Sequence, residues 1–240
     1  MRADAVTRGD AGVRPAATSA RRRRVPPRRG DAPAPDGGTP GREPSDETAA
    51  LGEAARALIH GRHKVGIKQL GGPGPDPAQL DRLLRAAAAA PDHGPMLPWR
   101  FVLVPAGKRA RLADAFAAAR RERDPDVGPL DLALARQVAF RAPLLLLAVA
   151  RLATSTRAAT PPLERAVSLG CAIENLLLSA HAMGFASGLT GGPEMGATAL
   201  RELFGLAPDE QAACFVHVGT GRPHRRPRAR PRPEDFLTEL

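Results

Sequence analysis

The run LLLLAVA at residues 144–150 constrains the fold more than any other stretch of the sequence. It is uninterrupted by any polar residue and is short. A segment of this kind is typical of a strand that is buried on both faces. We therefore expect a central strand here, with further strands over 99–105, within GFASGLTGGP at 184–193, and over 212–219.

Helical periodicity separates these strands along the chain. In the clearest case Asp76 is a typical N-cap, Pro77 suits the first helical position, and Pro91 ends the segment. A long segment, 163–183, is so apolar that it is typical of a central helix or one at a subunit interface. The other helices are expected over 46–61, 108–123, 130–140 and 198–204. The pattern predicts an α+β protein with a few buried strands between helices.

Composition divides the chain into a tail and one folded domain. Residues 1–46 are rich in Arg, Pro and Gly and contain almost no large apolar residue, so we expect a disordered basic tail. The folded domain is expected over 47–240. Only 3% of the residues are aromatic and none is Tyr, so Leu, Ala and Val must build its core. The formal net charge is +10, a sign that favours anionic ligands or surfaces.

Several classes of protein are not supported by the sequence. No apolar run reaches the ~18 residues of a membrane span, and no apolar region follows the N-terminal arginines, so we expect a cytoplasmic protein. Cys171 and Cys214 lie in apolar runs and are expected to be free thiols. The chain has no Rossmann glycine fingerprint, no phosphate-binding P-loop, no nucleophile elbow, and no spacing typical of a metal site. It is therefore either a binding or structural protein, or an enzyme whose cofactor carries the chemistry.

The junction APDHGPMLPWRFVLV, at 90–104, resembles a known motif. It follows the helix LDRLLRAAAAAP and resembles the R-A-P-D-H-x-x-M-x-P-W-x-F motif of the nitroreductase family of FMN-dependent oxidoreductases, in its compact NAD(P)H-dependent branch. Further similar segments are FRAPLLLLAVAR, SLGCAIENLLLSAHAMGF, LRELFGL, FVHVGTGRP and RPEDFLTEL. They occur in the family's order and cover about residues 50–240, so the resemblance is more specific than any single motif.

The resemblance implies a fold, an assembly and an activity. The fold would be nitroreductase-like, with a central mixed sheet flanked by helices, in a homodimer that holds one FMN at each side of its interface. The activity would be hydride transfer from NADH or NADPH through FMN to a nitroaromatic, a quinone or a similar flat acceptor, in a ping-pong cycle. No side chain would be needed as a catalytic acid or base, and no metal would be bound.

The resemblance also implies cofactor-binding residues. Arg62, His63 and Lys64 match an Arg-Arg-Ser sequence that contacts the FMN phosphate and ribityl chain, and only the first arginine is kept. His93 matches a histidine that contacts FMN. Without the family motif, the same residues would be interpreted as a solvated basic helix end and a structural loop histidine.

Other matched positions depart further from the family pattern. Leu189, Thr190 and Gly191 stand where the family has a Trp-Arg-Ser turn facing the flavin, so a backbone amide and a hydroxyl remain while the arginine is lost. Leu97 replaces a Gln or Asn, and Ala89 replaces a frequent Arg. Residues 179–184 match positions linked to the nicotinamide nucleotide. Arg225 or Arg226 could reach the FMN phosphate, or could belong to a solvated extension.

Two alternatives remain at this point. The departures from the family pattern leave open a catalytically silent flavin-binding relative. The basic ends, 1–46 and 222–232, leave open a nucleic-acid-associated protein, which we consider the less favoured interpretation because the tail has no aromatic residues for base stacking.

Overall fold

The computed structural model describes residues 45–92, 96–152, 160–221 and 229–240, and the account below is confined to them. The expected tail therefore lies outside the described residues up to position 44. His93 lies outside them as well, as do Arg225 and Arg226.

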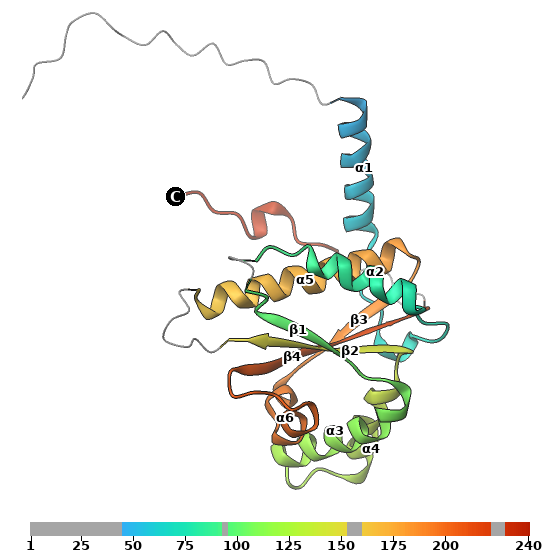
Figure 1. The fold of residues 1–240 in the computed structure, drawn as a ribbon, viewed down its shortest axis with the longest axis vertical. Helices are drawn as coiled ribbons and strands as arrows, with labels where there is room; N and C mark the ends of the chain where they lie inside the picture. The colour runs from blue at the N-terminus through green and yellow to red at the C-terminus, as the bar shows by residue number, and fades with distance from the viewer. Residues whose placement is uncertain (1–44, 93–95, 153–159, 222–228) are drawn as a thin grey trace, which may run out of the picture. The chain divides into compact units, whose positions relative to one another are not determined.

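A four-stranded antiparallel sheet lies at the centre of the fold (Figure 1). Its strands are β1 (Trp99–Leu103), β2 (Leu144–Arg151), β3 (Ala186–Thr190) and β4 (Glu210–Gly219), in the order β1-β2-β4-β3. Every residue of β2 except its last is buried, which confirms the prediction from the apolar run.

The α+β prediction is confirmed, with one correction to the expected mixed sheet. Each of the three described pairings is antiparallel. The reason lies in the position of β4, which is inserted between β2 and β3. Those two strands point the same way, because both are antiparallel to β4, but they do not pair with each other.

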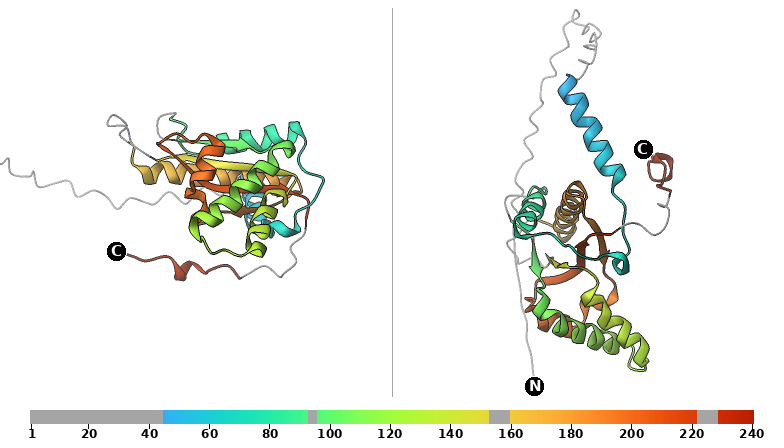
Figure 2. Two further views of the ribbon diagram at one scale, coloured as in Figure 1. Left: turned by 90° about the horizontal axis from the view of Figure 1, so that it is seen from below. Right: turned by 90° about the vertical axis from the view of Figure 1, so that its right-hand side faces the viewer.

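Six α-helices flank the sheet within the described residues, in the order α1 (Asp46–Gly61), α2 (Pro77–Ala88), α3 (Arg109–Arg123), α4 (Pro129–Gln137), α5 (Pro162–Ala182) and α6 (Thr198–Phe204). Helices α2 and α5 cover one face, and α3, α4 and α6 lie on the other (Figures 1 and 2). The expected helix over 130–140 is shorter, because Val138–Phe140 form a 3₁₀ turn. None of the described helices is both long and apolar enough to cross a membrane.

Capping explains where two of these helices begin. The Asp76 carboxylate accepts the amide of Gln79, and the Gln79 side chain accepts the amide of Asp76, so the two residues form a capping box ahead of Pro77. Ser45 accepts the amide of Thr48 at the start of α1. These local signals are present in the sequence, so the starts of both helices were predictable.

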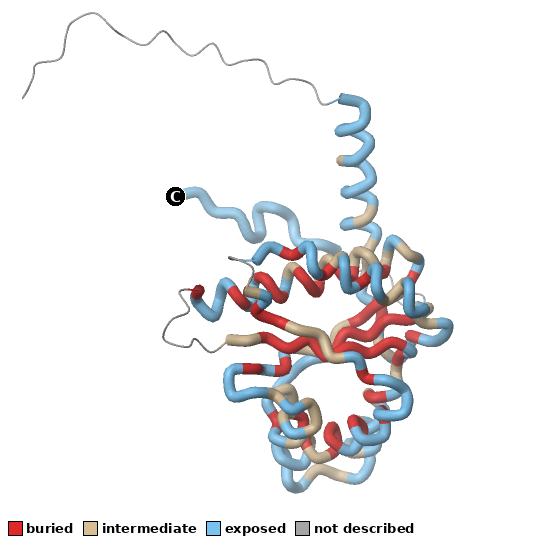
Figure 3. Tube along the Cα trace, viewed as in Figure 1, coloured by how far each residue is buried: buried red, intermediate tan, exposed pale blue. Residues whose placement is uncertain are grey.

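The strand β2 divides the core into two layers, because its side chains alternate between the two faces of the sheet. Leu144 and Leu146 pack with α2 and α5, whereas Leu145 and Leu147 pack with α3 and α6. Figure 3 shows the buried positions concentrated along the strands and on the helix sides that face them. Helix α1 differs, since none of its residues is buried.

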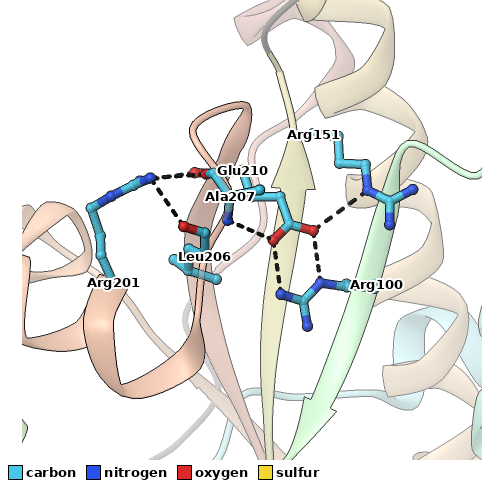
Figure 4. Close-up of polar contacts among 6 residues, drawn as sticks. All are labelled: Arg100, Arg151, Arg201, Leu206, Ala207 and Glu210. Carbon is cyan, nitrogen blue, oxygen red and sulfur yellow. Dashed lines mark hydrogen bonds and ion pairs between the residues drawn. The ribbon is translucent and has the colours of Figure 1, made fainter.

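A buried carboxylate ties three adjacent strands together at one end of the sheet (Figure 4). Arg100 of β1 donates two hydrogen bonds to Glu210 of β4, at 2.7 and 2.8 Å, and Arg151 of β2 donates a third at 3.5 Å. Arg201 donates to the carbonyl of Glu210 at 2.9 Å. The hydrogen bonds from Arg100 lower the pKa of the Glu210 carboxyl from 4.5 to about 2.

Replacing this carboxylate should destabilise the sheet in a pH-dependent way. We expect Glu210→Gln to lower the free energy of unfolding at pH 7 by roughly 2 kcal/mol, because Arg100 loses its charged partner. The folded-state pKa is depressed, so the stabilisation is complete above pH 4.5 and is lost as the pH falls toward 2. Urea titrations of both proteins at several pH values would show the difference narrowing over that window. Asp209→Asn, at the exposed neighbouring position, is the control; an equal loss there would contradict the assignment.

Candidate functional site

The first of two cavities that contain predicted site residues is lined by one arginine and two histidines. It has a volume of about 390 Å³ and lies where the end of α1, the end of α5 and the start of β3 meet. Arg62 and His63, both predicted site residues, line it together with His181 of α5. Glycines 61, 184 and 221 form part of its wall and keep it open. We call it the cationic cavity.

The Arg62 guanidinium is held in place from α5. Its Nε donates to the Glu174 carboxylate at 2.9 Å, and the arginine side chain is only 21% exposed. The same corner receives the C-terminal segment, because Arg230 donates to the carbonyls of Ile59, His60 and Arg62 at 2.9–3.3 Å. A cation at the carbonyl end of α1 is favourable for the helix dipole.

A strap, defined here as residues 62–72, runs beside β3 and positions Arg62. The amide of Val65 donates to the carbonyl of Ser187 at 3.0 Å, and Gly71 pairs with Thr220. The approach is close because Gly188 has no side chain: a Cβ there would lie 2.5 Å from the Val65 carbonyl oxygen. Gly219 and Gly221 permit similar contacts with Gly71 and Gln69. Glycines inside an expected strand are the signal that could have revealed this strap from the sequence.

The second cavity lies at the opposite end of β3 and is mainly apolar. Its volume is about 410 Å³. Thr190 and Gly191, both predicted site residues, line it together with Ile67 and Lys68 of the strap. Its other lining residues are Phe116, Arg120, Asp131, Leu134, Ala135, Val138, Arg141, Glu194 and Met195. We call it the apolar cavity.

A buried histidine fixes the Thr190 side chain. His217 of β4 is fully buried, and its Nε2 lies 2.8 Å from the Thr190 hydroxyl. Burial, and to a lesser extent the charge of Arg109, lowers the pKa of His217 to about 4, so the imidazole is neutral at physiological pH. This role of His217 was not predicted from the sequence, because the residue lies in an apolar strand with no motif around it.

The predicted site residues are distributed along one edge of the sheet. Arg62 and His63 lie beside the start of β3, and Thr190 and Gly191 lie at its end. Five residues of extended chain separate these groups by roughly 13 Å. Leu189, in the same strand, is partly buried and packs against the core shared by α2 and α5.

Two other predicted residues line neither cavity. Lys64 is exposed on the strap. Leu97 is 52% exposed and has a positive φ of 43°, and its amide donates to the Asp92 carboxylate at 2.7 Å. Trp99, two positions later, is buried and donates from its indole to Ser168 at 3.0 Å, so it anchors this junction to α5.

The described residues favour an anion over a metal ion as a ligand. They contain no group of three or more His, Cys, Asp or Glu side chains suited to a metal. The cationic cavity instead offers a guanidinium and two imidazoles, which are suitable donors for a phosphate group. The free thiols do not contribute to either cavity, and burial raises the pKa of Cys214 to about 11.

Comparisons with known proteins point to one family. The sequence profile of the Nitroreductase family matches residues 67–220, a range that begins just after Arg62, His63 and Lys64. A protein of Haemophilus influenzae named "Putative NAD(P)H nitroreductase" is 36% identical over 154 residues, covering 64% of this chain and 82% of the relative.

Solved structures agree on the fold. A nitroreductase-like family protein from Bacillus cereus aligns with a TM-score of 0.65 at 17% identity, covering 77% of this chain and 95% of the other. The FMN-dependent nitroreductase NfnB from Mycobacterium smegmatis, solved with NADPH, aligns with a TM-score of 0.60 at 19% identity, covering 79% and 99%.

The contact between the strap and β3 can be tested by adding one methyl group at Gly188. We expect Gly188→Ala to force the strap away from β3, costing roughly 1–3 kcal/mol and lowering the melting temperature by about 5 °C. The control is Gly170→Ala in α5, where a Cβ would meet nothing within 4 Å, so stability should be unchanged or slightly raised. Thermal unfolding followed by circular dichroism measures both. A Gly188→Ala protein as stable as the parent would contradict the close approach.

Proposed function

Because the chain belongs to the nitroreductase family, we propose that it is an FMN-dependent NAD(P)H oxidoreductase that reduces nitroaromatic, quinone or similar flat acceptors. The observation that carries the proposal is the arrangement along β3. Cationic donors lie at one end of this strand, and an apolar cavity with a fixed hydroxyl lies at the other. FMN has the matching chemistry, since it bears an anionic phosphate at one end and a flat ring at the other.

The donor set around the cationic cavity fits a phosphate. Among the described residues, Arg62 uses only its Nε toward Glu174, so the two Nη groups are available for phosphate oxygens. His63 and His181 line the same cavity and can donate further hydrogen bonds. We propose Arg62 and His63 as phosphate ligands, with Lys64 contributing positive charge from the strap and His93 as a further flavin contact.

The turn at the other end of β3, beside the apolar cavity, fits the ring. Thr190 and Gly191 line this cavity. Leu189 and Leu97, which line neither cavity, complete the proposed set of cofactor-binding residues. FMN, when bound, accepts a hydride from NADH or NADPH and passes the electrons to the acceptor. The protein's own part is to bind the phosphate, to orient the ring by hydrogen bonds, and to hold the acceptor against it.

We also propose a homodimer, and a folded domain over 47–240 that follows the basic tail. Exposed large apolar side chains on three segments support the dimer, because a second copy could bury them. They are Leu51 and Ile59 on α1, Leu163 and Val167 on α5, and Phe236 and Leu237 near the C-terminus. Helix α1 buries none of its residues against the described chain, so we propose that a second copy packs against it.

The proposed function predicts a yellow protein that turns over. The purified full-length chain should carry about one FMN per subunit, identified by its absorption spectrum and by the mass of the released cofactor. It should oxidise NADH or NADPH when a nitroaromatic or quinone is added. Flavin without turnover would identify a catalytically silent relative. A colourless protein that takes up no added FMN would refute the proposal.

Removing the Arg62 guanidinium should weaken flavin binding directly. We expect Arg62→Ala to raise the Kd for FMN by about 10- to 100-fold, because a charge-assisted hydrogen bond to phosphate is lost. Fluorescence titration of the apoprotein with FMN measures the change. Arg82→Ala, at an exposed position of α2, is the matched control and should bind FMN normally. An unchanged Kd for Arg62→Ala would remove this residue from the site.

A further inference from the structure

The apolar cavity has one wall that is only partly packed within the described protein. Asp131, Leu134, Ala135 and Val138 line it at the spacing i, i+3, i+4 and i+7, so they form one face of α4 and its terminal 3₁₀ turn. None of the residues of α4 is buried, and Leu134 is 42% exposed. An amphipathic helix normally buries such a face against a core. Here Ala135 and Val138 pack partly against the core, whereas Leu134 is left exposed at the cavity.

The opposite walls make this space a slot suited to a small ring. Phe116 of α3 and Met195, beside the end of β3, contribute apolar surface, and Ile67 closes the side formed by the strap. A volume of about 410 Å³ falls within the usual range for small-molecule sites. The hydroxyl of Thr190, held by the neutral His217, is a hydrogen-bonding group of the same lining.

The charged side chains that line the slot leave a net positive charge. Glu194 is neutralised by Arg120 at 3.0 Å and by Arg123 at 2.9 Å. Arg141 donates to the neutral amide of Gln137.

Two other charged residues of the lining, Lys68 and Asp131, have no ion-pair partner among the described residues. The slot therefore has two cations, Lys68 and Arg141, that no carboxylate holds, against one free carboxylate, Asp131. Positive charge remains for a ligand.

We propose that the apolar cavity is the acceptor site and that it selects planar aromatic acceptors bearing one acidic group, such as a carboxylate, over neutral ones. This rests on the proposed function, because it places the acceptor beside the turn that contacts the flavin. The ring lies against the open face of α4 and Phe116, and the acidic group lies toward Lys68 and Arg141. Lys68 and Arg141 disfavour acceptors that carry a positive charge, and the Asp131 carboxylate offsets part of this effect.

The test compares two acceptors of nearly the same shape on the full-length holoprotein, 4-nitrobenzoate and 4-nitrobenzamide. Equilibrium dialysis without NAD(P)H should show about tenfold tighter binding of the benzoate at low salt, with roughly threefold from each exposed cation. The preference should shrink in about 1 M NaCl, because salt screens exposed charges.

Variants distinguish the contribution of the cations to ligand binding from the contribution of the apolar wall. Lys68→Gln and Arg141→Gln should each reduce the preference for the benzoate and leave amide binding unchanged. Leu134→Ala, on the apolar wall, should weaken both ligands alike. Arg111→Gln removes a positive charge from an exposed position of α3 outside both cavities and should change neither.

The outcomes distinguish this inference from the proposed function. Equal binding of the two ligands would overturn the inference, as would Lys68→Gln and Arg141→Gln variants that lose both ligands equally. The neutral quinone menadione reports on the proposed function independently, since its NADPH-dependent reduction does not need the cations. Menadione turnover without benzoate preference would leave the function standing and the inference refuted.

Discussion

The burial of β2 on both faces is the constraint on which the rest of this structure depends. A strand whose first seven side chains are all apolar must be covered on each side, so one layer of helices is insufficient. The alternation along the strand assigns Leu144 and Leu146 to one core and Leu145 and Leu147 to the other. The remaining strands pair with β2 or with one another in the same sheet. The Glu210 carboxylate of β4 joins the ends of β1, β2 and β4 through two arginines.

The functional edge of the sheet depends on a different interaction, the approach of the strap to β3. Backbone can come this close only where side chains are absent, as at Gly188 and Gly221. The strap places Arg62 at one end of β3 and Lys68 at the other. A single packed segment therefore contributes to both cavities, so the spacing between them is set by the length of the strand and not by a flexible loop.

The sequence predicted those parts of the fold that depend on local chemistry. Capping residues placed the starts of α1 and α2, and apolar continuity placed β2. The antiparallel arrangement was not predictable in this way, because it depends on the insertion of β4 between β2 and β3, which no local pattern encodes.

The same distinction applies to the site. Arg62 and Thr190 were predicted as site residues from a family motif, whereas His217 and Glu174 act through contacts between residues far apart in the sequence.

Several arginines of the described residues have structural roles. Arg109 and Arg201 donate to backbone carbonyls, and Arg100 is committed to Glu210. A guanidinium satisfied in this way contributes little to ligand binding, because its donors are already used. Within the two cavities, donors that no backbone carbonyl uses remain on Arg62 at one end of β3 and on Lys68 and Arg141 at the other. Under the proposed function, these donors would hold two small acidic groups, the FMN phosphate and the acidic group of the acceptor.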